Sequence, residues 1–140
     1  MLGLDVGERR IGVAISVPEG TLAVPLRIIE RTDEGADLDA IAELARSERV
    51  EGLVVGFPRS LDGSVGAQAR RVEAFAKRAG KACGLPVELW DERLTSVQAA
   101  RPAPGSKRSR RPARTDDIAA AIILQGYLDR RATMTGQPST

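Results

Sequence analysis

The spacing of apolar side chains along the chain predicts alternating strands and helices. Two short apolar runs, at residues 1–6 and 11–17, flank a turn rich in glycine and charge, which is typical of a β-hairpin. A third strand is expected at residues 23–30, after a Pro-Glu-Gly turn. The nearly continuous apolar run at 52–57 is typical of a strand buried on both faces, and residues 86–91 predict a further strand.

Three other stretches repeat their apolar side chains every three to four residues, which predicts helices. In the first, acidic residues come before the apolar positions Leu38, Ile41, Leu44 and Ala45. In the second, the apolar stripe consists of Val65, Ala69, Val72, Phe75, Ala76 and Ala79. The third helix is expected from about residue 115 to about residue 131, with its stripe at positions 120, 123, 124, 127 and 128.

The predicted order is strand, strand, strand, helix, strand, helix, strand, helix. This order is typical of an α/β fold in which an antiparallel hairpin system leads into parallel crossovers. The chain has 140 residues, of which 42% are hydrophobic, and this suits one domain with one core. We expect that domain to cover residues 1–132, with a mobile loop at 101–114 and a disordered tail at 133–140.

The composition restricts the chemistry that the protein can perform. There is one cysteine, Cys83, so no intrachain disulfide is possible. There is no histidine, so a zinc site or a His-dependent triad is nearly excluded. Any bound metal is expected to be a hard cation with carboxylate ligands. The single cysteine agrees with a cytoplasmic protein, and the longest apolar run, at 118–124, is too short to cross a membrane.

Basic side chains are concentrated in the last third of the chain. Residues 1–92 carry 12 basic and 16 acidic side chains, whereas residues 93–140 carry 9 basic and 3 acidic ones. Six cations and no acid fall within residues 101–114, RPAPGSKRSRRPAR. Such a run is often only a solvated segment, but it also suits a phosphate-bearing partner.

Several acids could share a site with Asp5, which stands inside the first predicted strand. A carboxylate there costs several kcal/mol unless its charge is compensated. Asp91 and Glu92 end a strand, where successive side chains point to opposite faces, so only one of the two can share a site with Asp5. Asp116 and Asp117 open the last helix, each about 50° from the centre of its apolar stripe, so spacing does not choose between them. Acids in such positions are usually helix-dipole partners or solvated turn residues, but together they suit a site for Mg²⁺ or Mn²⁺.

Four blocks, in this order and spacing, give the chain a resemblance to the YqgF/RuvX family of RNase H-like nucleases. The blocks are Gly3-Leu4-Asp5-Val6-Gly7 with Arg10-Ile11-Gly12-Val13-Ala14, Val54-Val55-Gly56-Phe57-Pro58 with Asp62-Gly63-Ser64, Asp91-Glu92-Arg93-Leu94-Thr95, and Asp116-x-x-Ala119-Ala120 with Ile123-Leu124-Gln125. Members of this family are related to the RuvC Holliday-junction resolvase and include pre-16S rRNA nucleases. The resemblance implies an RNase H-like mixed sheet, with three antiparallel strands followed by parallel strands and flanking helices.

The resemblance also implies an activity and a set of functional residues. The protein would be a metal-dependent nuclease that hydrolyses phosphodiester bonds in structured RNA or in branched or single-stranded DNA. Its catalytic acids would be Asp5, Glu92 and Asp116, which would hold two Mg²⁺ or Mn²⁺ ions. The family implies backbone contacts from Arg10, Arg93 and Ser64, and the charge pattern adds Lys107, Arg108, Arg110 and Arg111. A non-catalytic RNA- or ribosome-binding module is the alternative, and the sequence leaves open a monomer or a homodimer.

Overall fold

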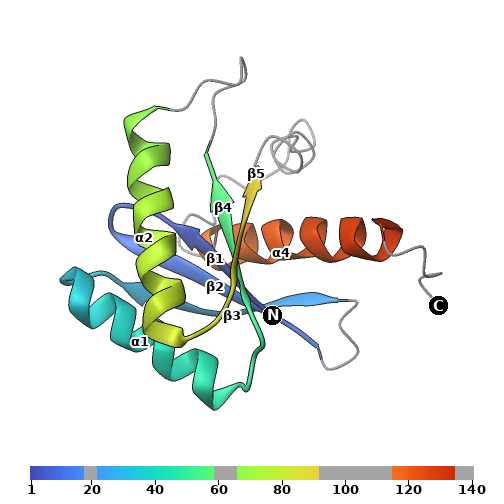
Figure 1. The fold of residues 1–140 in the computed structure, drawn as a ribbon, viewed down its shortest axis with the longest axis horizontal. Helices are drawn as coiled ribbons and strands as arrows, with labels where there is room; N and C mark the ends of the chain where they lie inside the picture. Colours follow the sequence, from blue (N-terminus) through green and yellow to red (C-terminus); the bar gives the residue numbers. More distant parts are fainter. Residues whose placement is uncertain (18–21, 59–65, 92–114, 135–140) are drawn as a thin grey trace.

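The computed structural model describes residues 1–17, 22–58, 66–91 and 115–134, with residues 115–117 and 132–134 described by their backbone alone. Within these ranges one five-stranded sheet has the strand order β3-β2-β1-β4-β5 (Figure 1). The strands are β1 (Leu2–Val6), β2 (Arg10–Ser16), β3 (Ala23–Glu30), β4 (Leu53–Phe57) and β5 (Val87–Asp91). The pairs β1–β2 and β2–β3 are antiparallel, and β1–β4 and β4–β5 are parallel. The predicted mixed sheet is therefore confirmed.

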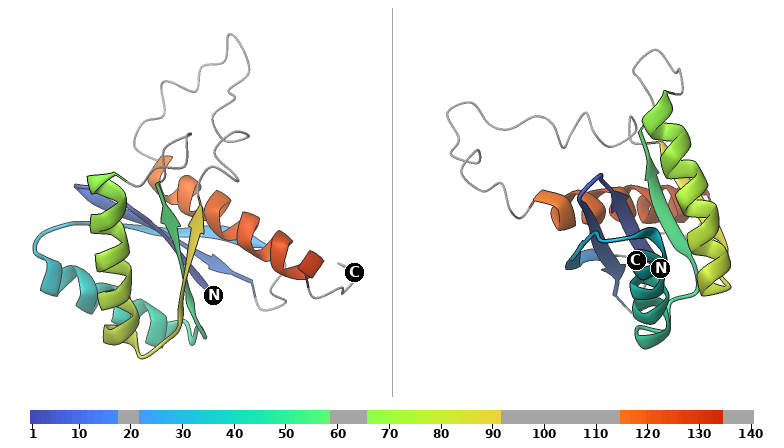
Figure 2. Two further views of the ribbon diagram at one scale, coloured as in Figure 1. Left: turned by 45° about the horizontal axis from the view of Figure 1, so that its top comes forward. Right: turned by 90° about the vertical axis from the view of Figure 1, so that its left-hand side faces the viewer.

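Helices cover both faces of this sheet (Figure 2). One face carries α1 (Glu34–Ser47) and α2 (Ala67–Cys83), and the other carries α4 (Thr115–Met134). Every predicted strand and helix is present, with ends that differ by a few residues. The last helix continues past the expected end at residue 131 as far as Met134, because alanine and methionine in its final turn favour helix. The expected loop at 101–114 lies outside the described residues, as do residues 135–140 of the tail expected at 133–140, whereas residues 133 and 134 belong to the last helix.

Local sequence signals explain where the helices begin and end. The Asp33 carboxylate accepts a hydrogen bond from the backbone N–H of Ala36 at 2.9 Å, which caps the first turn of α1. At the carboxyl-terminal end of α2, Gly84 takes the left-handed conformation with φ +70°, and its N–H donates a hydrogen bond to the carbonyl of Gly80.

No helix in the described part of the chain is both long enough and apolar enough to cross a membrane.

Alternation along the strands sends neighbouring side chains into two separate cores. Leu2, Leu4 and Val6 of β1 are buried beneath α1 and α2. The second core lies beneath α4 and contains Ala14, Val54, Trp90, Ala120, Ile123, Leu124 and Leu128. Because successive side chains of a strand point to opposite faces, Gly3 and Asp5 of β1 face α4.

An aromatic pair joins β5 to α4 within the second core. The rings of Trp90 and Tyr127 meet edge to face, with their centres 6.4 Å apart and their planes at 89°. The Nε1–H of Trp90 is buried and has no hydrogen-bond partner among the described residues. A second tie reaches β3, where the backbone N–H of Ala23 donates to Oε1 of Gln125 at 2.9 Å. The position of α4 on the sheet is thus fixed from two strands.

Candidate functional site

The carboxyl ends of β1, β4 and β5 lie at the same edge of the sheet, because these three strands are parallel neighbours. Open α/β sheets bind their ligands at this edge. Asp5 is the second to last residue of the central strand β1, and its side chain is partly buried. The structure therefore brings the first predicted site residue to the edge where a ligand has access.

Glycines occupy the positions beside Asp5 on both neighbouring strands. Asp5 lies directly opposite Gly12 of β2. On the other side Leu4 pairs with Val55, so the position after Val55, Gly56 of β4, is level with Asp5. Both glycines are buried, and a strand glycine often marks a place where a ligand approaches the backbone. The positions directly beside Asp5 on both paired strands therefore carry no side chain.

Helix α4 rests directly on Gly3, two residues before Asp5 on the same face. A Cβ atom added to Gly3 would stand 2.8 Å from the Cβ of Leu124 and 3.2 Å from the carbonyl oxygen of Ala120. Any side chain at this position would therefore push the helix away from the sheet. The glycine sets how closely α4 approaches the strand that carries Asp5.

The direction of α4 places its first turn near the edge of the sheet where Asp5 lies, at the carboxyl ends of the parallel strands. Its carboxyl-terminal part lies near the amino end of β1, where Leu128 and Arg131 line a surface pocket with Met1. From Gly3 the helix therefore extends the other way toward the carboxyl ends of the strands, as the left view of Figure 2 shows. Asp116 belongs to this first turn, one turn before Ala120. The structure describes only its backbone.

Of the two acids at the end of β5, Asp91 faces away from Asp5. Trp90 lies in the core beneath α4, and alternation therefore directs Asp91 to the face covered by α1 and α2. Asp91 is therefore not available as a ligand on the Asp5 face, and the predicted ligand at this strand end is the next residue, Glu92. That residue lies outside the described residues, as do the predicted nucleic-acid contacts Ser64, Arg93, Lys107, Arg108, Arg110 and Arg111.

Within the described ranges, no three acidic, cysteine or histidine side chains gather into a metal site. Of the three predicted ligands, the structure describes the side chain of Asp5 alone. Its surroundings fit a hard divalent cation, since the carboxylate is partly buried and has glycines on both sides. The metal-binding roles of Glu92 and Asp116 stay predictions.

Arg10, a predicted nucleic-acid contact, lies on the same face as Asp5 at the start of β2. Its neighbour Ile11 is buried in the core beneath α1 and α2, so alternation turns Arg10 toward the α4 side. The Arg10 Nε lies 3.1 Å from Oε2 of Glu30 in an ion pair whose side chains are 46% and 73% exposed. Exposed pairs of this kind contribute about 0–1 kcal/mol, and the role of Arg10 in nucleic-acid binding stays a prediction.

The strand order, with its antiparallel and parallel pairs, shows that the protein has an RNase H-like fold. Thermus thermophilus RuvC has a similar structure, with a TM-score of 0.59 and 17% identity over 94% of this chain and 95% of that one. The same protein in complex with a Holliday junction substrate gives a TM-score of 0.56 and 18% identity over 93% of both chains. At such low identity the likeness concerns the fold alone.

The chain belongs to the RuvX family. The family model described as "RuvX: Holliday junction resolvase" matches residues 1–130. A protein of Moorella thermoacetica is 51% identical over 132 residues, which cover 93% of this chain and 94% of the relative. A protein of Gloeobacter violaceus is 45% identical over 131 residues, or 94% of this chain and 84% of the relative. Both relatives are named "Putative pre-16S rRNA nuclease", and the predicted family is confirmed.

Proposed function

We propose that this protein is a nuclease that hydrolyses phosphodiester bonds in structured nucleic acid. The observation that carries the proposal is the position of Asp5, which lies at the carboxyl edge of the sheet between Gly12 and Gly56. A partly buried carboxylate with a glycine beside it on each paired strand suits a site where charged phosphates and cations meet. The names of the relatives at 45% and 51% identity support the same activity.

The residues proposed to hold the metal ions are Asp5, Glu92 and Asp116. They offer carboxylate oxygens alone, which are the ligands that Mg²⁺ and Mn²⁺ prefer. Two bound ions would supply a water of lowered pKa for attack on the phosphorus and would stabilise the leaving oxygen. Asp5 would orient this pair from the central strand, and Arg10 would bind a neighbouring phosphate of the substrate.

Pre-16S rRNA is the first candidate substrate, because the names of the relatives point to it. Branched DNA is the second, since the family model is described as a Holliday junction resolvase. Processing of a ribosomal RNA precursor would take place in the cytoplasm, and the single cysteine agrees with a reducing compartment.

The test is a cleavage assay on a panel of labelled substrates with Mn²⁺ or Mg²⁺. The panel holds a four-way DNA junction, single-stranded DNA, and an RNA that spans the 5′ end of mature 16S rRNA with its precursor flank. Cleavage of the RNA, abolished by EDTA and missing from an Asp5→Asn preparation purified in the same way, supports the first candidate. Cleavage of the junction alone selects DNA. Binding without cleavage of any substrate overturns the nuclease proposal and favours the RNA- or ribosome-binding module.

A further inference from the structure

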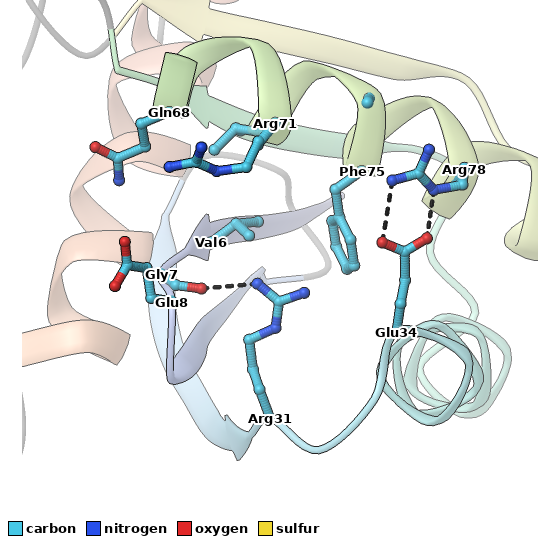
Figure 3. Close-up of a pocket in the computed structure, with 11 residues that line it drawn as sticks. Val6, Gly7, Glu8, Arg31, Glu34, Gln68, Arg71, Phe75 and Arg78 are labelled. Atoms are coloured by element: carbon cyan, nitrogen blue, oxygen red, sulfur yellow. Dashed lines mark hydrogen bonds and ion pairs between the residues drawn. The ribbon is translucent and has the colours of Figure 1, made fainter. Parts of the chain in front are cut away.

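The turn that follows Asp5 is held from the opposite face of the sheet by Arg31 (Figure 3). The Nη1 of Arg31 donates a hydrogen bond to the carbonyl oxygen of Gly7 at 2.8 Å. The backbone N–H of Arg31 donates to the carbonyl of Arg9 at 2.9 Å, and the N–H of Gly7 donates to the carbonyl of Arg10 at 2.8 Å. One residue therefore binds both sides of the β1–β2 turn.

The Arg31 side chain is itself fixed by buried partners. Its Nε donates to Oδ2 of Asp37 at 3.0 Å, and the Asp37 residue is 2% exposed. The other oxygen of Asp37 accepts from the backbone N–H of Thr32 at 3.2 Å. The guanidinium also lies over the ring of the buried Phe75, 5.0 Å from its centre. A planar group that is stacked on one face and bonded along two edges has little freedom to move.

The turn is also tightly packed. A Cβ atom added to Gly7 would stand 2.9 Å from the carbonyl oxygen of Arg10. On the preceding residue, Val6, the side chain is buried among the residues beneath α1 and α2. The end of β1 is therefore held in place by the apolar core and by Arg31 on one face, while Asp5 projects from the other.

We propose that Arg31 is a positioning residue for Asp5, and the inference rests on the proposed role of Asp5 as a metal ligand. Metal ligands must stand within about 0.2 Å of their ideal distances. Gly7 is two residues from Asp5, so a shift of the Gly7 carbonyl would change the direction of the Asp5 carboxylate. Loss of the hydrogen bond from Arg31 to Gly7 should therefore weaken metal binding and leave the affinity for nucleic acid without metal unchanged.

Gly7, Arg31 and Arg78 line one surface pocket (Figure 3), and Arg78 supplies a matched control. Its guanidinium pairs with the Glu34 carboxylate, with Nη2 3.0 Å from Oε1. These two side chains are 50% and 41% exposed and join α2 to α1. No hydrogen bond or ion pair between Arg78 and the β1–β2 turn occurs among the described residues, so Arg78→Met removes an ion pair from this pocket and leaves the turn unchanged.

The experiment uses two variants of Arg31, because a simple truncation would leave Asp37 buried without a partner. Arg31→Lys keeps the charge beside Asp37, but a lysine lacks the planar fork that reaches both Asp37 and Gly7. The double variant Arg31→Met with Asp37→Asn removes both charges and keeps an oxygen for the N–H of Thr32. Circular dichroism checks that each variant is folded.

Two quantities are measured on each variant with the full chain. Calorimetry gives the affinity for Mn²⁺, and a cleavage assay gives the Mn²⁺ concentration at half-maximal rate. Loss of a partner that orients a metal ligand typically costs about 10-fold to 100-fold in metal affinity or activity, and we expect both Arg31 variants to fall in this range. Nucleic-acid binding in EDTA should be unchanged, and Arg78→Met should match the wild type in all three measurements.

The possible failures are distinguishable. If the wild type binds Mn²⁺ and cleaves, and the folded Arg31 variants do so at the same Mn²⁺ concentration, the positioning role is overturned. It is equally overturned if Arg78→Met weakens Mn²⁺ binding as much as Arg31→Lys does, because the effect would then be a general loosening of α1 and α2. If the wild type neither binds Mn²⁺ nor cleaves, the proposed function fails and this inference falls with it.

Discussion

Gly3 of β1 lies in direct contact with Leu124 of α4, since a Cβ atom at Gly3 would stand only 2.8 Å from the Leu124 Cβ. Gly3→Ala should therefore lift α4 from the sheet and lower the free energy of unfolding by about 1–3 kcal/mol, as overpacking usually does. Urea unfolding measures the change. The control is Gly66→Ala, because nothing lies within 4 Å of a Cβ at that position, and its effect should stay below about 1 kcal/mol.

Asp5→Asn tests the acid on the central strand. The amide keeps the shape of the side chain but removes the charge that would bind a cation, so cleavage should fall by more than about 100-fold, beyond the effect of removing a supporting residue. The fold should persist, and thermal stability in metal-free buffer should rise, because the substitution removes one charge from the three acids proposed to lie together. Cleavage with Mn²⁺ and a melting curve in EDTA measure the two effects. Activity that survives the substitution would show that the cation is held elsewhere.

The neighbours Asp116 and Asp117 provide a comparison within one helical turn. The family resemblance gives the metal-binding role to Asp116, so Asp116→Asn should abolish cleavage while Asp117→Asn keeps most of it. Both substitutions remove one negative charge from the same end of α4, which matches their effects on helix stability. Cleavage rates at saturating Mn²⁺ measure the difference. Equal decreases would mean that the register of the first turn differs from the expectation.

The elements of the fold were predictable because their signals are local. The stripe at positions 120, 123, 124, 127 and 128 predicted the buried side of α4, and four of these residues are buried while Tyr127 is partly buried. The run at 52–57 predicted a strand covered on both faces, and β4 is buried from Leu53 to Gly56 between β1 and β5. A period of two or 3.6 residues needs no knowledge of the rest of the chain.

The surroundings of Asp5 could not be predicted in the same way. Gly12 and Gly56 become its neighbours only through the registers of two strand pairs, which the apolar pattern does not specify residue by residue. Arg31 and Asp37 are more than 25 residues from Asp5 in the sequence. Their neighbours in the sequence are typical of surface charges, so nothing local indicated their contact with the turn after Asp5. For Asp91, the sequence established only that a strand directs one of two adjacent acids to a given face, and the buried position of Trp90 was needed to decide which.

The basic stretch at 101–114 is the subject of a fourth prediction. Changing Lys107, Arg108, Arg110 and Arg111 together to Ser should weaken nucleic-acid binding, because cations that neutralise phosphates contribute affinity through counterion release. The slope of log affinity against log salt should flatten by about 0.7 to 0.9 for each phosphate that the variant no longer neutralises. Sequence preference should barely change, since binding to phosphates carries no base information. Binding titrations at several salt concentrations give both quantities. Wild-type affinity and slope in the variant would make the stretch a solvated linker and leave Arg10 and Arg93 as the next candidates.

The edge-to-face contact of Trp90 with Tyr127 makes the intrinsic fluorescence of the protein sensitive to the position of α4 on β5. The chain contains one tryptophan and one tyrosine, and their ring centres are 6.4 Å apart, so light absorbed by the phenol is passed to the indole. Trp90 lies on β5, two residues before Glu92, and Tyr127 is carried by α4, the helix that has Asp116 in its first turn. The emission of the unlabelled protein therefore reports on the separation of the two elements that supply the proposed ligands, and it can be followed while metal or nucleic acid is added.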